Sequence, residues 1–419
     1  MKKDAGVKRI VSKNTPNRKM NGFLDCFEII WETIHEKYFD PTFGGLDWHE
    51  VHDRYQPLIT AVHDEKTFYE LANKMLFELN VSHVAVLPPE EKDQIDPILC
   101  STGSIGINLR LLEKVLVINA VDQGSPGEMA GLMPGFVIRK INGQTIQQLS
   151  NEVRRIPPLN DRNEETQVTI NILKQFYRPP GNLINLVFLD ENDEEKQAII
   201  QCSQRDGKVL LSEELPACFL QFDSGRLEGD IGWIRFNAFI PPVDELFRAA
   251  LTDLRDTQAL IIDIRGNHGG VWPIRKLLAE NLVNEPALFC SYQSRECIQE
   301  IFLKPVENPY TGPLAVLVDV LSMSSAEEFA GAMQTIHRGV VVGERTSGIC
   351  VVCDFLELPN SALLVFPIKQ SVTRKGKALE GHGVIPDIKV ALDRTQLLQG
   401  IDSQLIAAIK HLKNEIKEE

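Results

Sequence analysis

Two loops in the C-terminal half of the chain carry residue types that suit acyl transfer. The first, Asp263 to Gly270, follows an apolar run and ends in Gly269 and Gly270. The backbone N–H groups of such glycines can approach a substrate as closely as an oxyanion hole requires. The second loop, Leu321 to Phe329, leads into a predicted helix, where unpaired N–H groups and the helix dipole favour negative charge. It therefore suits a serine nucleophile that has the N–H of Ser325 as its own oxyanion donor.

A structural interpretation of the same serines stands beside the catalytic one. Serine is among the preferred residues at the N-cap of a helix. Ser322, Ser324 and Ser325 all stand where they could cap the predicted helix. The loop taken alone is therefore consistent with a nucleophilic serine and with a serine that only caps the helix.

The elements around these loops are predicted to form a parallel sheet covered by helices. Strands are predicted at Ile231–Phe236, Leu260–Ile264, Leu314–Val318 and Val340–Val342, and helices at Val243–Leu254 and from about Ser324 to Ile336. Such βαβ alternation collects ligands at the C-terminal ends of the strands. We therefore expect both loops to lie at one edge of an α/β core.

The beginning of the chain is predicted to be helical. Apolar residues recur every three or four positions from Phe23 to Tyr38, which places them on one helical face. A second helix is predicted from Thr67, because Thr67 and Glu70 match a capping box. A strand is then predicted at Val81–Leu87, and it carries the pair Ser82-His83.

Residues 100–203 have a different texture, with short β-rich runs and glycine turns. Their motifs are, in order, Gly103 to Ile107, Gly124-Ser125-Pro126, Ala130-Gly131-Leu132, Pro134-Gly135 and Ile141 to Gln144. This order resembles a PDZ domain. In such a domain the backbone N–H groups of the first loop, here Ser104, Ile105, Gly106 and Ile107, turn towards a peptide carboxylate, and the peptide adds as a strand. The stretch 177–196 is interpreted as a hairpin insertion.

Four further motifs occur in a fixed order and extend the resemblance. They are D-x-R-x-N-x-G-G at 263–270, S-x-S-S-A-E-E-F-A at 322–330, V-G-E-R-T-S-G at 342–348 and E-G-H-G-V-I-P-D at 380–387. From about residue 21 the chain resembles the tail-specific (C-terminal processing) serine protease family. The resemblance implies a multi-domain α/β protein whose core is crotonase- or ClpP-like, with Ser324 as the nucleophile. The expected domains are a tail (1–20), a helical module (21–99), a PDZ-like domain (100–203), a protease core (204–395) and a C-terminal helix (396–419).

The resemblance also indicates which residue is the base. In the serine–lysine branch of the family a lysine follows the G-E-x-T-x-G run, but that position is Ile349 here, and isoleucine cannot accept a proton. The tricorn-like branch instead uses the histidine of an S-H pair, here Ser82-His83, with an acidic partner at Glu380. An imidazole of pKa about 6.5 can accept a proton at neutral pH. We therefore predict a tetrad in which Ser324 is the nucleophile, His83 the base, and Ser82 and Glu380 orient the histidine.

Other histidines remain candidate bases. His268 lies inside the glycine loop, where the family usually has a small residue, and could crowd or tune the oxyanion hole. His382 adjoins Glu380 and is the runner-up. His337 falls at the far end of the helix that begins at Ser324 and is the weakest candidate.

The composition excludes several kinds of partner. The 419 residues contain 44 Lys and Arg against 58 Asp and Glu, for a net charge of −14. Such an acidic surface disfavours nucleic acids and anionic membranes. No apolar run approaches the ~20 residues that span a bilayer. No apolar leader follows the basic N-terminus, so we expect a cytoplasmic protein, with an exported form that has lost its leader as the alternative.

The cysteines indicate neither a disulfide scaffold nor a metal site. Eight cysteines in 419 residues are too sparse for such a scaffold. Cys350 and Cys353 form a C-x-x-C motif, but no second pair completes a set of four ligands, so we interpret them as thiols on a strand. We expect no metal and no organic cofactor.

These features together predict a serine endopeptidase that cleaves unfolded or C-terminal polypeptide segments through an acyl-enzyme. The PDZ-like domain would capture substrates with free C-termini. The alternative is a catalytically inactive protease scaffold that binds peptides or apolar ligands, suggested by the absent lysine and by His268. Acyl-CoA chemistry on a crotonase-like fold ranks last because it gives no reason for the PDZ-like domain. No sequence feature sets an oligomeric state.

Overall fold

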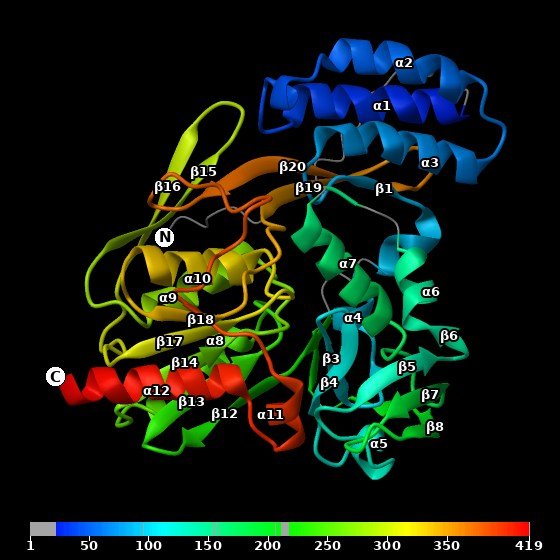
Figure 1. The fold of residues 1–419 in the computed structure, drawn as a ribbon. Coiled ribbons are helices and arrows are strands. Elements are labelled where there is room, and N and C mark those ends of the chain that lie inside the picture. Colours follow the sequence, from blue (N-terminus) through cyan, green and yellow to red (C-terminus); the bar gives the residue numbers. More distant parts are fainter. Residues whose placement is uncertain are drawn as a thin grey trace.

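The computed structural model describes residues 22–94, 96–153, 156–158, 160–205, 207–210 and 218–418, so the expected tail at 1–20 lies outside the described residues. The chain forms three connected parts (Figure 1). We call them the N-terminal helices, the middle module and the core. The expected mixed α/β architecture with several sheets is confirmed. Within the described residues, no helix combines the length and the apolar character needed to cross a membrane.

The N-terminal helices are α1 (Gly22–Lys37), α2 (Trp48–Thr60) and α3 (Glu65–Leu76). The helix α2 was not predicted from the sequence. The predicted capping box of Thr67 and Glu70 is wrong, because α3 begins earlier. Its N-cap is Asp64, whose side chain accepts the N–H of Thr67 at 2.9 Å. Aspartate is at least as good an N-cap as threonine, and Asp64 directly precedes Glu65, the first residue of α3.

The strand after these helices, β1 (Ala85–Leu87), is shorter than the predicted strand at 81–87. The reason is His83, which has a φ of 53° and so leaves the extended region of backbone conformation. Ser82 and His83 therefore lie in a turn ahead of the strand. Strand β1 pairs antiparallel with β20 (Leu363–Val372).

Strand β20 is the centre of a sheet that joins both ends of the chain. It pairs with β1, with β19 (Val351–Glu357) and with β15 (Ala287–Gln293), and β15 pairs with β16 (Ile298–Leu303). The N-terminal helices pack onto this sheet (Figure 1), and Phe27 and Phe68 share one buried cluster with Leu364 and Phe366. The N-terminal helices therefore share their hydrophobic core with this sheet.

The middle module is built on an antiparallel sheet in the order β3-β4-β5-β7-β8. Its strands are β3 (Ile107–Leu112), β4 (Val115–Val121), β5 (Val137–Ile141), β6 (Gln144–Thr145), β7 (Leu183–Leu189) and β8 (Glu195–Gln201), with β2 (Gly103–Ser104) and β9 (Ser203–Gln204) paired apart from them. Its helices are α4 (Pro97–Cys100), α5 (Pro126–Met129), α6 (Ile146–Asn151) and α7 (Asp161–Leu173). The hairpin β7–β8 covers much of the stretch 177–196. Interpreting it as an insertion is wrong, because β7 pairs with β5 and belongs to the sheet.

The core contains a second sheet in the order β12-β13-β14-β17-β18-β21. Its strands β13, β14, β17, β18 and β21 run parallel to one another. The strands are β12 (Phe222–Leu227), β13 (Ile231–Phe236), β14 (Ala259–Asp263), β17 (Leu314–Val318), β18 (Val340–Gly343) and β21 (Ile388–Lys389). The short pair β10 (Lys208–Leu210) and β11 (Cys218–Leu220) precedes it, and α11 (Arg394–Leu398) follows it. The fully buried strands β14 and β17 are continuous apolar runs, as expected for a parallel sheet covered on both faces.

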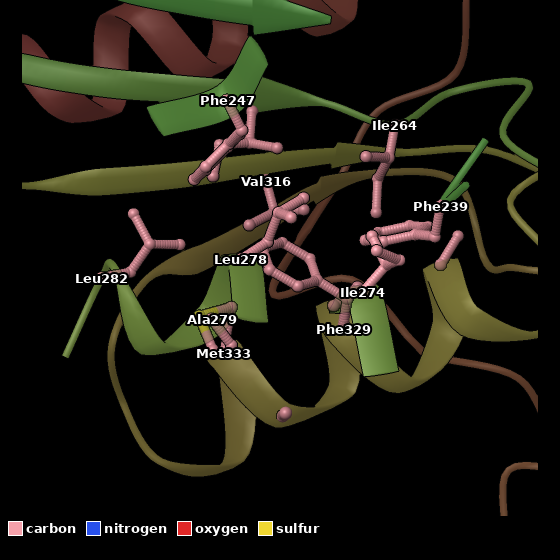
Figure 2. Packing of buried hydrophobic residues seen from close by; sticks show 14 of the residues in the cluster. Phe239, Phe247, Ile264, Ile274, Leu278, Ala279, Leu282, Val316, Phe329 and Met333 are labelled. Atoms are coloured by element: carbon pink, nitrogen blue, oxygen red, sulfur yellow. The ribbon is translucent and has the colours of Figure 1, made fainter. Parts of the chain in front are cut away.

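Helices cover both faces of this sheet. Phe247 of α8 (Val243–Asp253), Leu278 of α9 (Trp272–Glu280) and Phe329 of α10 (Ser325–Thr335) pack with Ile262 and Val316 in one cluster. Figure 2 shows Leu278, Val316 and Phe329 of this cluster packing between the strands and helices α9 and α10. On the other face, α12 (Ser403–Glu418) packs through Ala408 and Leu412. Both predicted chemistry-bearing loops thus leave the C-terminal ends of neighbouring strands, β14 and β17.

Candidate active site

Ser324 stands directly ahead of α10 in a strained backbone conformation, with φ 53° and ψ −116°. A residue other than glycine adopts such angles only at a cost of about 1–3 kcal/mol, which contacts with its surroundings must offset. The Ser324 N–H donates to the carbonyl of Ile349 at 2.9 Å and to Glu327 Oε2 at 3.1 Å. The Glu327 N–H in turn donates to the carbonyl oxygen of Ser324 at 2.9 Å. The side chain of Glu327 thus reaches back to the Ser324 N–H, as in a capping box, and these bonds fix the turn through the backbone.

Glu327 is the fully buried centre of this turn, and it was not predicted from the sequence. Its Oε1 accepts the hydroxyl of Thr346 at 2.6 Å and the N–H of Gly348 at 2.7 Å. Its Oε2 accepts the N–H of Ile349 at 3.0 Å as well as that of Ser324. Burial raises the pKa of Glu327 to about 7, although these donors act to lower it. One carboxylate thus ties the nucleophile turn to the loop 342–349.

The glycine loop lies against Ser324, the predicted nucleophile. A Cβ atom added to Gly269 would lie 2.8 Å from the Cβ of Ser324, so only glycine fits there. The N–H of Gly269, however, donates to Asn267 Oδ1 at 2.9 Å, which contradicts the predicted oxyanion role of this residue. Within the described residues, no acceptor pairs with the N–H of Gly270 or of Ser325. The Ser325 hydroxyl donates to the carbonyl of Gly270 at 2.8 Å and so joins the two segments that carry these N–H groups.

A buried arginine supports this junction. Arg275 of α9 is only 2% exposed and pairs with the buried carboxylate of Glu328. It also donates to the hydroxyl of Ser325 at 3.3 Å and to that of Tyr292. Arg275 was not predicted from the sequence. The Glu327-Glu328 pair in the first turn of α10 was the one sequence signal that could have indicated these buried contacts. Acidic residues in a first turn are, however, equally typical of helices whose dipole they complement.

Ser82, His83 and Glu380 form a hydrogen-bonded relay. Ser82 Oγ donates to Glu380 Oε2 at 2.9 Å and lies 2.8 Å from His83 Nδ1. Glu380 also accepts the backbone N–H of Ser82 at 2.6 Å and that of Cys350 at 2.7 Å. Because the single hydroxyl proton of Ser82 goes to the carboxylate, its oxygen accepts from Nδ1–H of His83. The Nε2 atom of His83 then carries the free lone pair that a general base needs.

Burial sets the charge states of the relay. It lowers the pKa of His83 to about 4, so the imidazole is neutral at pH 7. Burial also raises the pKa of Glu380, and the N–H groups of Cys350 and Ser82 partly oppose that rise. A neutral imidazole is the form that can accept a proton from a serine.

The dipeptide Ile349-Cys350 connects the relay to Ser324, the predicted nucleophile. The carbonyl of Ile349 accepts the N–H of Ser324, and the next N–H, that of Cys350, binds Glu380. The buried thiol of Cys350 also donates to the carbonyl of Ser324 at 3.6 Å. Within the described residues, no hydrogen bond joins the hydroxyl of Ser324 to His83, so proton transfer between them stays a prediction. Ile349, which stands where the serine–lysine branch has its lysine, thus contributes to the site through its backbone carbonyl.

The other candidate histidines are engaged elsewhere. His268 Nδ1 lies 2.6 Å from Asp96 Oδ2. His382 Nδ1 bonds to the carbonyl oxygen of Glu380 at 2.9 Å, which is the backbone and not the carboxylate. His337 is exposed and follows the C-terminal end of α10, whereas Ser324 precedes its start.

The predicted carboxylate-binding loop Ser104–Ile107 opens the middle module. Ser104 belongs to β2, and Ile107 is the first residue of β3. The N–H of Gly106 donates to Ser104 Oγ at 3.1 Å, and the carbonyl of Ile105 accepts the N–H of Gly127 at 2.7 Å. The loop therefore leads directly into β3, and one of its N–H groups already has a partner.

A polar cavity of about 330 Å³ opens beside Glu380, where the three parts of the molecule meet. Its lining is Tyr38, Phe39, Leu79, Asn80, Val81, Pro158, Asn160, Gln370, Glu380 and Gly381. Among the described residues, no three His, Cys, Asp or Glu side chains are grouped to hold a metal ion. Cys353 lies on β19 and Cys350 immediately before it.

Two family profiles and several known proteins match this chain. The profile of peptidase family S41 matches residues 230–390, and that of the tricorn protease C1 domain matches residues 23–77. A carboxyl-terminal-processing protease of Synechocystis sp. is 26% identical over 364 residues, covering 85% of this chain and 78% of that protein. A putative tricorn protease homolog of Streptomyces coelicolor is 23% identical over 369 residues, covering 85% of this chain and 29% of that protein.

Two solved structures share the fold. The photosystem II D1 C-terminal processing protease has a TM-score of 0.58 at 19% identity, covering 88% of this chain and 93% of its own. Mature CPAF in complex with lactacystin has a TM-score of 0.64 at 13% identity, covering 95% of this chain and 99% of its own. Together the fold, the family profiles and the relatives define the class of this protein as a serine-type peptidase. The resemblance that the motifs predict is thereby confirmed: residues 230–390 match peptidase family S41, and relatives that align with most of the chain are named carboxyl-terminal-processing proteases.

Proposed function

We propose that this peptidase cleaves unfolded or C-terminal polypeptide segments with Ser324 as nucleophile and His83 as base. The observation that carries the proposal is the relay from Glu380 through Ser82 to His83, which leaves His83 Nε2 as a neutral acceptor. The match of residues 23–77 to the tricorn protease C1 domain supports a histidine base, because the tricorn-like branch uses one.

In the proposed reaction, His83 Nε2 takes the proton of Ser324 as its Oγ attacks the scissile carbonyl carbon. The N–H groups of Ser325 and Gly270 then donate to the oxyanion, and electrostatic stabilisation of this kind usually contributes more to such catalysis than any other single effect. His83 returns the proton to the leaving amine, which gives an acyl-enzyme on Ser324. A water molecule, deprotonated by His83, hydrolyses this ester and regenerates the serine.

The proposed substrates are polypeptides with free C-termini. The names of several relatives, carboxyl-terminal-processing proteases, support this class. The middle module fits a PDZ-like role in capture, since the loop Ser104–Ile107 leads into β3 at the end of its sheet. A strand added there would hold the peptide and raise its effective concentration near Ser324. The cavity beside Glu380 is large enough to accept a substrate side chain.

The test is labelling of the full chain with a fluorophosphonate probe, together with cleavage of an unstructured peptide. We expect labelling at Ser324, no turnover in Ser324→Ala, and a loss of kcat of at least about 10²-fold in His83→Ala. His382→Ala is the matched control and should keep at least half of the wild-type rate. Absence of labelling would favour the inactive scaffold, and full activity of His83→Ala would end the assignment of the base. Equal turnover of free and amidated C-termini would remove the capture step.

A further inference from the structure

His268 stands directly before Gly269 and Gly270, and its side chain is only 5% exposed. Its Nδ1 atom lies 2.6 Å from Oδ2 of Asp96, a residue 172 positions earlier in the chain. Asp96 directly precedes α4. The proposed reaction uses neither of these two side chains. The pair nevertheless connects the glycine loop to a segment that is distant in the sequence.

Asp96 is a fixed anchor for this imidazole. Its Oδ1 accepts the N–H groups of Ile98 at 3.0 Å and of Leu99 at 2.9 Å. Burial alone would raise the pKa of Asp96, but the His268 imidazole and these two N–H groups hold it below its usual range. Asp96 is therefore ionised at neutral pH and can only accept hydrogen bonds, so the proton between the two side chains belongs to Nδ1 of His268.

The peptide bond between Gly269 and Gly270 has a defined orientation. The carbonyl of Gly269 accepts the N–H of Phe239 at 2.7 Å, and the carbonyl of Phe239 accepts the N–H of Val271 at 2.9 Å. Because the C=O and N–H of a trans peptide bond point in opposite directions, the N–H of Gly270 is directed away from Phe239. A Cβ atom added to Gly269 would lie 3.0 Å from the backbone nitrogen of Ser325. The segments that carry the two proposed oxyanion donors are therefore in contact.

Two adjacent glycines make this orientation easy to lose. Gly269 and Gly270 have φ values of 91° and 144°, and glycine also tolerates many other conformations. A turn of the peptide plane would present the carbonyl of Gly269 to the oxyanion in place of the N–H of Gly270. Asn267 Oδ1 accepts the N–H of Gly269 at 2.9 Å and opposes such a turn from within the loop. The bond between His268 and Asp96 opposes it from outside the loop, because the turn also displaces the backbone of residue 268.

From these contacts we infer that His268 is a positioning residue for the oxyanion hole and that Asp96 holds it in place. The pair keeps the N–H of Gly270 directed at the oxygen on which charge develops when Ser324 attacks. It acts through the backbone of the glycine loop and not by contact with the substrate. Its effect is therefore on the transition state, and hence on kcat, more than on binding of the peptide. This inference rests on the proposed function.

The test compares His268→Ala and His268→Asn with His52→Ala. His52 is the matched control, because it forms another histidine–carboxylate contact, with Glu28 at 3.0 Å, between α2 and α1. Each full-length variant is measured for kcat and KM on an unstructured peptide. We expect His268→Ala to lower kcat at least tenfold with KM changed less than threefold. His268→Asn supplies an amide N–H near the place of Nδ1 and should keep at least a third of the wild-type kcat, and His52→Ala should match the wild type.

The variant Asp96→Asn separates the pair from the cap of α4. Asparagine caps a helix as well as aspartate does, and its amide oxygen must take the place of Oδ1, which accepts two N–H groups. The amide NH₂ group then faces Nδ1–H of His268, so the contact is lost. We expect kcat to fall at least fivefold. The double variant Asp96→Asn/His268→Ala should be at most twofold slower than His268→Ala, because both changes remove the same function.

A peptide aldehyde reports on the oxyanion hole directly. Ser324 Oγ adds to its carbonyl carbon, the serine proton passes to His83, and the former carbonyl oxygen takes the place of the oxyanion. In His268→Ala the inhibition constant of the aldehyde should rise by about the factor by which kcat/KM falls, as for a transition-state analogue. Adding His268→Ala to Ser324→Ala should leave the binding of an uncleaved peptide unchanged, as measured by fluorescence anisotropy.

Thermal unfolding followed by circular dichroism checks the fold of each variant, and His268→Asn and Asp96→Asn decide if His268→Ala does not fold. An unchanged kcat in His268→Ala, or a fall in kcat without loss of affinity for the aldehyde, would overturn the inference. A loss of the same size in His52→Ala would also overturn it. A wild-type protein that is labelled at Ser324 and cleaves the peptide shows that the proposed function stands even then, whereas one that does neither overturns both.

Discussion

At the scale of single residues, the site depends on two residues that hold unfavourable backbone angles. Ser324 and His83 both have positive φ values, 53° in each case. Such angles persist where surrounding contacts determine them, and here those contacts are the carboxylates of Glu327 and Glu380. Each carboxylate accepts a backbone N–H at the strained turn, from Ser324 itself and from Ser82, the neighbour of His83. The turn that carries Ser324 and the turn that carries His83 are thus each held by a carboxylate that accepts a backbone N–H.

The relay predicts distinct effects for its two outer members. Ser82→Ala removes the acceptor of His83 Nδ1–H, and Glu380→Gln replaces the carboxylate that takes the hydroxyl proton of Ser82. Both changes free the imidazole to adopt the other tautomer. We expect each to lower kcat between about 10- and 1,000-fold with KM changed less than threefold, since tautomer and orientation matter for the proton transfer and not for substrate binding.

Steady-state kinetics on one unstructured peptide measure this prediction. The double variant Ser82→Ala/Glu380→Gln should be little slower than the worse single variant, because both remove the same function. Losses that multiply would show that the two residues act independently and that no relay operates.

At the scale of elements, the start of α10 is held by a carboxylate that titrates near neutrality. Protonation of Glu327 would turn one of its oxygens into a donor facing other donors. Because burial raises the pKa of this group to about 7, its ionised, turn-ordering form is lost as the pH falls through about 7. His83 does not contribute to this change, since its pKa is lowered to about 4.

We therefore expect kcat to rise as the pH increases from about 6 to 8. Glu327→Gln imitates the protonated group and should lower kcat at pH 8 by about 10- to 100-fold, with no rise through neutrality. Measurement of kcat from pH 5.5 to 9 tests both points. Glu415→Gln, a change of a half-exposed carboxylate on α12, is the control and should follow the wild-type profile. A level wild-type profile, or a rise that persists in Glu327→Gln, would contradict the assignment.

At the scale of the whole molecule, the proposed base, His83, and the proposed nucleophile, Ser324, belong to parts that share a hydrophobic core. Phe366 of β20 is 1% exposed and packs in one cluster with residues of the N-terminal helices. We expect Phe366→Ala to destabilise the protein by about 3–5 kcal/mol, the usual cost of a buried phenylalanine truncation. The N-terminal helices should unfold together with the core, although the changed residue lies outside them.

Guanidinium unfolding measures this in a Trp233→Phe/Trp272→Phe background, where the remaining tryptophans, Trp31 and Trp48, lie in the N-terminal helices. The fluorescence midpoint should fall together with that of far-ultraviolet circular dichroism. Phe355→Ala on the neighbouring strand is the control, because that side chain is 45% exposed and should cost less than about 1 kcal/mol. A fluorescence midpoint that does not move would show that the helices fold independently.

The order of residues along the chain was enough to predict most of the fold elements and to select candidates for the reacting groups. The strands Ile231–Phe236 and Leu314–Val318 were predicted with their observed bounds, because continuous or alternating apolar runs bounded by turns have few other solutions. The motifs also selected Ser324, His83, Ser82 and Glu380 as candidates. Errors arose where one residue overrides a pattern, as Asp64 does at the start of α3 and His83 does at the start of β1.

Only the tertiary structure decided which backbone groups are free and which carboxylates hold the site together. That the N–H of Gly269 is used by Asn267, and that Glu327 joins the turn at Ser324 to the loop 342–349, depends on contacts that no local pattern encodes. The bond between Ser82 and Glu380 spans 298 positions in the chain. Propensity and periodicity act over a few residues, whereas a buried hydrogen bond between distant segments is set by how complete elements pack, and it exists only once the chain has folded.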